Sequence, residues 1–136
     1  MELNLSTRQG IKRKSNQDAL SFNDSFVHSK KDLNISEIIS NFNDNIFIVA
    51  DGMGGYAGGD YASNYAIREI YKQFITNKNS FDISDCLNAI DDKLIEISKN
   101  DPTKSGMGTT VVAAIISSSH INIFNVGDSC LYHVTE

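Results

Sequence analysis

The chain has 136 residues, the size of one folding unit, and 40% of them are hydrophobic, enough for an apolar core without disulfide or metal support. Its net charge of −5 argues against nucleic acid or an anionic membrane surface as the main partner. No apolar run approaches the roughly 18 residues that span a membrane. Because residues 1–6 also lack the pattern of a secretion signal, we expect a cytoplasmic protein.

The first third predicts strands separated by polar loops. Residues 2–7 alternate apolar and polar side chains, as a half-buried strand does. A basic loop over residues 11–16 leads to a second expected strand at residues 17–22. Residues 23–45 are rich in Asn, Asp and Ser, and their small apolar cluster predicts a loop with one short helix at residues 36–41.

The centre of the chain joins a strand, a glycine-rich loop and a helix. Residues 46–50 form an apolar, β-prone run that stops at Asp51, and five glycines follow within residues 52–59. Apolar side chains then recur every three or four residues over residues 59–75, which predicts a helix with one buried face. Asp51 should therefore lie at the C-terminal end of a strand, beside a loop whose backbone can approach a ligand closely.

A second helix is expected at residues 84–99, which carry one apolar face. Asp82 or Ser84 is suited to be its N-cap, and Pro102 follows its end as a stop signal. The helix contains Cys86, which has no Cys-x-x-Cys partner. Since Cys130 is far away in the sequence, we expect both cysteines to be small buried hydrophobic residues in a reducing compartment.

The last third predicts strands again. Residues 111–116 are uniformly apolar, which favours a buried strand. Residues 121–126 and 130–134 are expected to be two more strands, separated by a turn at residues 127–129.

The glycine loop offers one alternative function. The six residues Gly-Met-Gly-Gly-Tyr-Ala from Gly52 match the G-x-G-x-x-A fingerprint of dinucleotide-binding proteins. Two features count against this interpretation. Asp51 would direct negative charge at a pyrophosphate, and the position about 20 residues further on falls inside the predicted helix, where the fingerprint needs the end of a second strand.

Three polar clusters stand at predicted strand edges or turns: Arg13 with Gln17 and Asp18, Asp51 with Gly52, and Gly127 with Asp128. Carboxylates and backbone carbonyls are hard oxygen ligands, and they favour Mg²⁺ or Mn²⁺ over zinc. An aspartate at a strand end is also a common turn former or helix cap. Taken singly, these residues leave both interpretations open.

Four segments carry motifs: residues 10–19 (Gly-Ile-Lys-Arg-Lys-Ser-Asn-Gln-Asp-Ala), 49–55 (Val-Ala-Asp-Gly-Met-Gly-Gly), 106–110 (Gly-Met-Gly-Thr-Thr) and 126–129 (Val-Gly-Asp-Ser). Together they resemble the metal-dependent serine/threonine protein phosphatases of type 2C, the PPM family, in its bacterial form. Each motif is weak alone, but the four occur in the family's order across nearly the whole chain. On this resemblance, residues 1–136 are the N-terminal portion of a single PPM-type phosphatase domain.

The resemblance implies an α+β fold, a two-sheet antiparallel β-sandwich flanked by helices (α-β-β-α), here truncated after the first half. It also implies two Mn²⁺ or Mg²⁺ ions, and a third, weaker site, in a cleft at one end of the sheets. Asp51 would bridge the two ions, and Gly52 would offer its backbone carbonyl. Asp18 would support the metal shell, and Asp128 would serve the third site. A water bridged by the metals would attack phosphorus, with Arg13 binding the phosphate.

The chain departs from the family in three places. Gln17 stands where many members have a glutamate that holds metal-bound water, so an amide without negative charge would orient that water. Met53 replaces a histidine that animal members carry as a proposed proton donor. The family's later Ser-Asp-Gly and Asp-Asn motifs, whose aspartates complete the metal shell, are absent from this sequence. Thr109 and Thr110 are expected to pack in a strand and not to bind metal.

The leading hypothesis is therefore a phosphoserine/phosphothreonine phosphatase of bacterial signalling that acts on phosphorylated proteins and opposes a serine/threonine kinase. In this hypothesis the 136-residue chain is an incomplete fragment of a longer protein, or a truncated product that pairs with another chain, and its own activity is open. The alternative, from another functional class, is a catalytically dead phosphatase-like module that binds phosphoproteins or regulates a partner. The substitution at Gln17 and the absent motifs motivate it.

Overall fold

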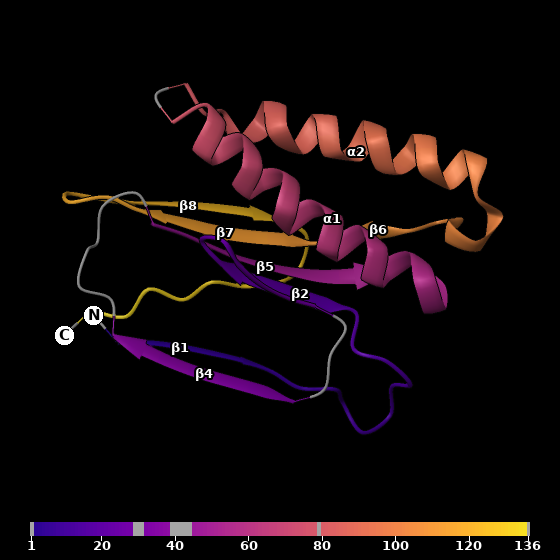
Figure 1. The fold of residues 1–136 in the computed structure, drawn as a ribbon, viewed down its shortest axis with the longest axis horizontal. Helices are drawn as coiled ribbons and strands as arrows, with labels where there is room; N and C mark the ends of the chain where they lie inside the picture. The colour runs from indigo at the N-terminus through magenta and orange to yellow at the C-terminus, as the bar shows by residue number, and fades with distance from the viewer. Residues whose placement is uncertain (1, 29–31, 39–44, 79, 136) are drawn as a thin grey trace.

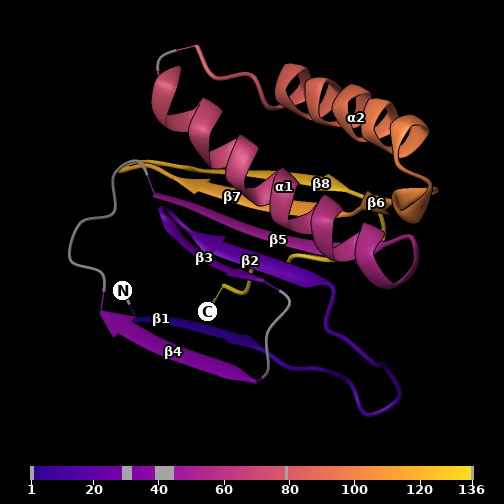
Figure 2. The same ribbon diagram turned by 45° about the vertical axis from the view of Figure 1, so that its right-hand side comes forward.

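The computed structural model describes residues 2–28, 32–38, 45–78 and 80–135 of the chain. Helices α1 and α2 form one layer, a large antiparallel sheet forms the second and a two-stranded sheet forms the third (Figure 1). Figure 2 shows the same order of layers after a turn of the molecule.

In chain order the elements are β1 (Glu2–Thr7), β2 (Asp18–Phe22), β3 (Ser25–His28), β4 (Leu33–Ile38), β5 (Asn45–Met53), α1 (Gly55–Thr76), α2 (Ile83–Asn100), the 3₁₀ turn η1 (Pro102–Lys104), β6 (Gly108–Thr109), β7 (Val111–Ile116) and β8 (Ile121–Val126). The predicted α+β fold with two antiparallel sheets is confirmed.

Strand β5 is the centre of the large sheet, whose order is β3-β2-β5-β7-β8, with β6 paired to the end of β5. All of these pairs are antiparallel. In the described part of the chain, the small sheet consists of β1 and β4. This topology brings the C-terminal end of β5 between the start of β2 and the segment that joins β6 to β7.

The two faces of β5 have different roles because successive side chains point to opposite sides of a sheet. Ile46, Ile48 and Ala50 are buried under α1, in a main hydrophobic core to which α2 also contributes side chains. The alternate residues therefore point to the other side, where Phe47 stacks on a phenylalanine of β2 with ring centroids 4.9 Å apart. Asp51 continues this second series, so its carboxylate is directed away from the helices.

Both predicted helices are present, and the first begins earlier than expected. Helix α1 starts at Gly55, four residues before the predicted start, and its N-cap Gly54 has a left-handed backbone with φ 115°. Helix α2 has the expected cap, because the Asp82 side chain accepts hydrogen bonds from the backbone N–H of Ser84 at 2.7 Å and of Asp85 at 3.2 Å.

The segment predicted as a loop with a short helix contains two strands instead. Strand β3 pairs with β2, and β4 pairs with β1 along its whole length. Residues 36–38 of the expected helix belong to β4, and residues 39–41 lie outside the described part of the chain. The helical interpretation was wrong because Leu33 and Ile35 alternate with polar residues, and pairing with β1 satisfies the backbone hydrogen bonds of such a strand.

The predicted strand at residues 130–134 is also wrong, because within the described ranges no strand pairs with this segment. Tyr132 and Val134 are 83% and 87% exposed, and an extended run without a neighbour forms no ladder. Cys130 is exposed, contrary to expectation. Cys86 is buried as predicted, and burial raises the pKa of its thiol to about 11.

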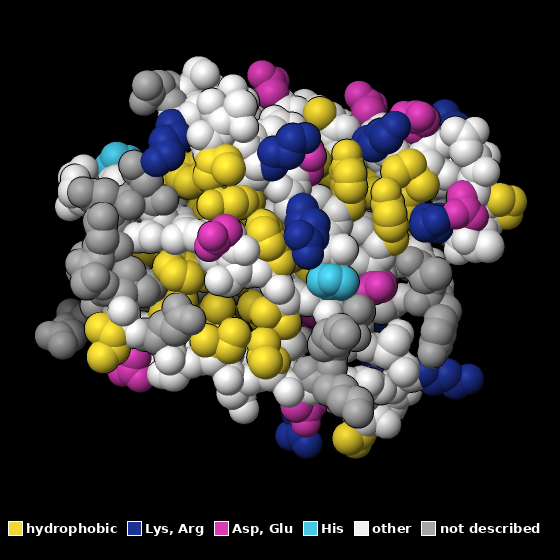
Figure 3. All heavy atoms as spheres, viewed as in Figure 1, with side chains coloured by type: hydrophobic (Ala, Val, Ile, Leu, Met, Phe, Trp, Pro, Cys, Tyr) yellow, Lys and Arg dark blue, Asp and Glu magenta, His cyan; other side chains and the backbone are white. Residues whose placement is uncertain are grey.

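The face of the large sheet that is turned away from the helices is only partly covered. Val49 of β5 is 48% exposed, and Ile121 and Ile123 of β8 are each 46% exposed. In the view of Figure 3, hydrophobic side chains gather below the helices, while charged side chains are interspersed over the helical layer. Among the described residues, no helix combines the length and apolar character needed to cross a membrane.

Candidate active site

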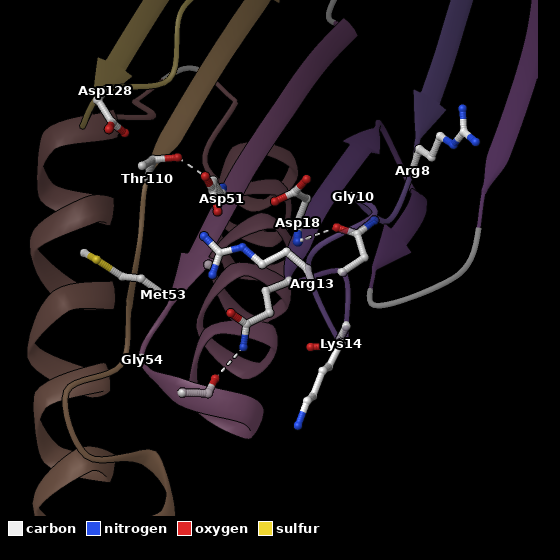
Figure 4. Close-up of a pocket in the computed structure, with 15 residues that line it drawn as sticks. Arg8, Gly10, Arg13, Lys14, Asp18, Asp51, Met53, Gly54, Thr110 and Asp128 are labelled. Atoms are coloured by element: carbon white, nitrogen blue, oxygen red, sulfur yellow. Dashed lines mark hydrogen bonds between the residues drawn. The ribbon is translucent and has the colours of Figure 1, made fainter.

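A cavity of about 610 Å³ opens at the end of the large sheet where β2 begins and β5 ends (Figure 4). All six site residues predicted from the sequence line it: Arg13, Gln17, Asp18, Asp51, Gly52 and Asp128. Arg8, Lys14, Met53 and Thr110 line it as well. The fold therefore gathers residues from three distant parts of the sequence around one space.

The cavity holds a pair of carboxylates on neighbouring strands. Asp18 of β2 and Asp51 of β5 are directly opposite each other in the antiparallel ladder, and both side chains point into the cavity. Burial raises the pKa of Asp18 above its usual value, and the adjacent Asp51 carboxylate raises it further. A bound cation would relieve this repulsion, which is the electrostatic condition expected of a metal site.

The backbone of Asp51 is held on both sides by two threonines that follow the Gly-Met-Gly motif. Its carbonyl oxygen accepts hydrogen bonds from the Thr110 backbone N–H at 2.9 Å and from the Thr109 hydroxyl at 3.1 Å. Its N–H donates to the Thr110 hydroxyl oxygen at 3.0 Å. These contacts fix the backbone from which the Asp51 carboxylate projects. Sequence reasoning gave the threonines a packing role only and missed these bonds.

Gly52 is required because two backbone segments meet at its Cα. A side-chain carbon at this position would lie 2.0 Å from the Gly59 carbonyl oxygen and 2.8 Å from that of Gln17. Gly59 is equally constrained, since its own added carbon would lie 2.7 Å from the Gly52 carbonyl carbon. The glycines therefore let α1 pack directly on the end of β5. That the Gly52 carbonyl binds a metal stays a prediction.

Gln17 connects the start of β2 to the start of α1. Its backbone carbonyl accepts hydrogen bonds from the Gly52 N–H at 3.2 Å and from the buried Ser63 hydroxyl at 2.6 Å. Its side-chain amide donates to the Gly55 carbonyl. A glutamate could not make this last bond, because a carboxylate has no proton to donate when it is ionised. The amide thus has a structural role that the sequence did not predict, and its contact with metal-bound water stays a prediction.

The loop before β2 is anchored by Asn16, a residue that sequence reasoning did not single out. Its side-chain amide donates to the Thr7 hydroxyl at 2.7 Å, and its carbonyl oxygen accepts from the Asp18 N–H at 3.1 Å. Both Asn16 and Thr7 are buried. An Asn two residues before an Asp, at the start of a strand, is the sequence signal of such an Asx turn.

Arg13 brings positive charge into the cavity. Its backbone N–H closes a turn onto the Gly10 carbonyl at 3.1 Å, and its guanidinium points toward the side where Asp51 and Met53 lie (Figure 4). None of the ion pairs that the described residues form within 4.0 Å involves Arg13. Its planar fork of donors is therefore available to an anionic ligand.

Asp128 lies on the opposite side of the cavity from Asp18, in the turn after β8. The donors present are the hard oxygens that Mg²⁺ and Mn²⁺ prefer, so Asp18 and Asp51 fit a divalent cation in chemistry and in charge. In the part of the chain that the structure describes, however, no three His, Cys, Asp or Glu residues form a group that could hold a metal.

The fold and site define an α+β protein with a polar cavity that combines acidic residues with an arginine. The sequence pattern of the family described as protein phosphatase 2C matches residues 12–136. The chain belongs to the protein phosphatase 2C family, whose members generally use Mn²⁺ or Mg²⁺.

Individual relatives agree with this assignment. The serine/threonine phosphatase stp of Listeria monocytogenes serotype 4b is 38% identical over 94 residues, which cover 64% of this chain and 37% of the relative. A putative protein phosphatase 2C-type of Streptococcus pyogenes serotype M6 is 26% identical over 137 residues, which cover 95% of this chain and 48% of the relative. The chain therefore spans less than half the length of these proteins.

The fold is similar to that in the crystal structure of the Mycobacterium tuberculosis serine/threonine phosphatase PstP/Ppp, with a TM-score of 0.60. Sequence identity is 20%, and the similarity covers 94% of this chain and 47% of that one. At this level of identity the comparison supports the fold and says nothing of individual site residues.

The carboxylate pair leads to a prediction for Asp18→Asn in the protein without divalent ions. Because the pKa of Asp18 is raised on folding, the folded state binds more protons than the unfolded state between pH 3.8 and that raised value, so stability falls as pH rises through this window. The neutral amide should remove a like-charge repulsion of about 0.2–1 kcal/mol at pH 7 and raise Tm by about 1–4 °C.

Thermal unfolding in chelator from pH 3 to 7 measures this effect. The gain should be present at pH 7 and disappear below pH 3.8, where Asp18 is protonated in both states. Asp24→Asn is the control, because Asp24 is an exposed turn residue that does not line the cavity. This variant removes the same charge and should not show a gain in Tm that appears between pH 3.8 and pH 7. A lower Tm for Asp18→Asn at pH 7 would contradict the prediction.

Proposed function

We propose that this chain forms part of a metal-dependent phosphatase that hydrolyses phosphoserine and phosphothreonine in proteins. One observation carries the proposal: in a chain of the protein phosphatase 2C family, Asp18 and Asp51 are opposite each other in a cavity that Arg13 also lines. The names of the relatives, serine/threonine phosphatases, supply the substrate class. Phosphorylated proteins are therefore the proposed partners, and a serine/threonine kinase is the proposed opposing enzyme.

In this proposal two Mn²⁺ or Mg²⁺ ions would be held by Asp51, Asp18, Gln17 and the Gly52 carbonyl, and Asp128 would hold a third. When bound, such ions supply Lewis acidity, which lowers the pKa of an attacking water and offsets the charge on the phosphoryl oxygens. The protein's own contribution is to keep the Asp51 carboxylate in place through the backbone bonds to Thr109 and Thr110 described above. A bound cation would relieve the repulsion between the Asp18 and Asp51 carboxylates, and this relief would favour metal binding.

Arg13 is proposed to bind the phosphate of the substrate. A guanidinium offers two parallel N–H donors to two phosphate oxygens, and such charge-assisted bonds are stronger than neutral ones. The loop that carries Arg13 starts at Gly10 and ends at Asn16, whose buried amide holds it to β1. Met53 has no proton to give, so water is proposed to protonate the leaving alkoxide.

We further propose that residues 1–136 are the N-terminal portion of one phosphatase domain in the cytoplasm. The span of 37–48% of the relatives supports the first part. The face of the large sheet that is turned away from the helices also supports an incomplete domain, because Val49, Ile121 and Ile123 on this face are about half exposed. The free thiols of Cys86 and Cys130 support a reducing compartment. Coding sequence downstream of Glu136 with Ser-Asp-Gly and Asp-Asn motifs would be the direct genetic support.

Replacing Arg13 tests the phosphate-binding role. Arg13→Ala should lower kcat/KM for a phosphothreonine peptide about 10- to 100-fold, because charge-assisted hydrogen bonds contribute about 1.5–3 kcal/mol. Arg13→Lys should recover part of the lost kcat/KM, because an ammonium group keeps the positive charge but cannot donate two parallel hydrogen bonds. The assay measures phosphate release in Mn²⁺ with the protein in the full length that its gene encodes.

Arg8 is the matched control. It also lines the cavity, but its guanidinium pairs with Asp32 at 3.5 Å, and both side chains are largely exposed. Arg8→Ala should therefore change kcat/KM less than about threefold. Equal losses for the two variants would mean that general positive charge, and not a specific contact from Arg13, favours the substrate.

The second candidate function is a phosphatase-like module that binds without catalysis. Two observations favour it: the Gln17 amide is engaged with Gly55, and the described residues contain no group of three metal-binding side chains. Isothermal titration of Mn²⁺ combined with a turnover assay separates the two functions. Tight binding of two ions with turnover by the 136-residue chain itself would exclude the module, whereas phosphopeptide binding without turnover at full length would exclude the enzyme.

A further inference from the structure

Thr110 interrupts the ladder of the large sheet at the position of Asp51. The register runs unchanged from Val49 opposite Val112 to Gly52 opposite Thr109, so Asp51 lies opposite Thr110. In an antiparallel ladder every second pair of opposite residues exchanges N–H···O=C bonds in both directions. The bond between the Thr110 N–H and the Asp51 carbonyl marks this pair as one of them. Here Thr110 donates its N–H to the Asp51 carbonyl, but the Asp51 N–H bonds to the Thr110 hydroxyl. The Thr110 carbonyl oxygen lies 2.9 Å from the Thr109 hydroxyl instead, whose single proton it shares with the Asp51 carbonyl at 3.1 Å.

The same side chain contacts the turn that carries Asp128. The Thr110 hydroxyl lies 2.8 Å from the Ser129 hydroxyl, and the Ser129 carbonyl accepts the side-chain amide of Asn125 at 2.7 Å. Since the Thr110 oxygen accepts from Asp51, its own proton can be donated to Ser129. The Thr110 hydroxyl thus connects the backbone of Asp51 with the turn that carries Asp128.

The methyl group of Thr110 leaves no room for a side chain at Gly127, the residue before Asp128. Gly127 has φ 105°, and a side-chain carbon there would lie 2.7 Å from the Thr110 methyl carbon. Asp128 is therefore placed between two residues that both contact Thr110, Gly127 through the methyl and Ser129 through the hydroxyl. Figure 4 shows Asp51, Thr110 and Asp128 in this succession along one wall of the cavity.

We propose that Thr110 is a positioning residue that fixes Asp51 and Asp128 relative to each other. The part that concerns metal ions rests on the function proposed above, whereas the link between the two aspartates does not. A threonine that merely packs in a strand could be replaced by valine, which has the same shape and a high strand propensity. The proposal requires the hydroxyl, and this difference makes it testable.

Three variants of the chain separate the contacts. Thr110→Val keeps the shape and removes the hydroxyl, Thr110→Ser keeps the hydroxyl and removes the methyl, and Ser129→Ala breaks only the bond to the turn. Amide hydrogen exchange by NMR, without metal, reports on the first link. Thr110→Val should speed exchange of the Asp51 amide about tenfold or more relative to the core amides of β5. Thr110→Ser and Ser129→Ala should leave it near the wild-type rate.

Paramagnetic line broadening by Mn²⁺ reports on the second link and tolerates weak binding. In the wild type and Thr110→Ser, amide signals of residues 51–53 and 127–129 should broaden over one range of Mn²⁺ concentration. In Thr110→Val and Ser129→Ala, broadening at residues 127–129 should require about 10- to 100-fold more Mn²⁺, the usual effect of removing a group that orients a metal ligand. Thermal unfolding of each variant controls for loss of the fold.

The outcomes are distinct. Wild-type exchange at Asp51 in Thr110→Val would overturn the proposal, and so would a Thr110→Ser variant that exchanges as fast as Thr110→Val. If Thr110→Val does not fold, Ser129→Ala decides, and unchanged Mn²⁺ broadening at residues 127–129 overturns the link. If wild type shows no broadening at millimolar Mn²⁺, the metal-dependent function fails, and the exchange data alone then support or overturn the positioning role.

Discussion

Gly52→Ala is expected to destabilise the chain by more than about 4 kcal/mol, a large fraction of the stability of a domain of this size. The added carbon would lie 2.0 Å from the Gly59 carbonyl oxygen and 2.8 Å from the Gln17 carbonyl oxygen. Both neighbours are backbone atoms, so relief requires moving the first turn of α1 or the start of β2. Either shift would displace the residues that position Asp18 and Asp51. Urea denaturation followed by circular dichroism measures the loss.

Gly10→Ala is the matched control for this substitution. Gly10 also lines the cavity, but a side-chain carbon there would meet nothing within 4 Å. Its alanine variant should be within about 1 kcal/mol of the wild type, or slightly more stable because the unfolded chain loses freedom. A Gly52→Ala protein as stable as Gly10→Ala would show that α1 does not pack on β5 as described.

Asp51→Asn should abolish function while preserving the fold. The amide has nearly the shape of the carboxylate, and the backbone bonds from Thr109 and Thr110 do not involve the side chain. It removes one charge from the pair with Asp18, which favours the metal-free fold. The same change replaces one carboxylate oxygen of the proposed metal ligand with an NH₂ group and removes its negative charge, so Mn²⁺ affinity should fall at least tenfold and turnover at least about a thousandfold.

Isothermal titration with Mn²⁺ and phosphate release at saturating Mn²⁺ measure these two losses separately. Asp91→Asn is a suitable control, because Asp91 is an exposed residue of α2 that does not line the cavity. Turnover by Asp51→Asn within tenfold of the wild type would remove Asp51 from the mechanism, whatever its effect on metal affinity.

Much of the architecture could be predicted because local patterns and tertiary packing agree. The apolar run before Asp51 is the central strand, and the periodic apolar residues before and after Asp82 form two amphipathic helices. The strand extends through Gly52 to Met53, three residues further than its apolar run, because pairing with β6 continues the ladder. Helix α1 begins among glycines of low helix propensity, because the contact between Gly52 and Gly59 holds its first turn on the sheet.

Other features depend on partners that a single sequence does not reveal. Strand β4 was missed because Ile35 and Ile38 also fit a helical spacing, and only its pairing with β1 selects the strand. The hydroxyl of Thr110 was missed because threonine is also an ordinary strand residue. Its role depends on the proximity of Ser129, 19 positions later in the chain. Conversely, the apolar residues of segment 130–134 predict a strand that has no partner in the described structure.

The central claim is that this cavity belongs to a metal-dependent phosphatase for phosphoserine and phosphothreonine. The most direct measurement is phosphate release from a phosphothreonine peptide by the full-length gene product, first in chelator and then after Mn²⁺ is restored. The account predicts no release in chelator, recovery with Mn²⁺ or Mg²⁺, and no recovery in Asp51→Asn. Equal release in chelator and in Mn²⁺ would contradict it.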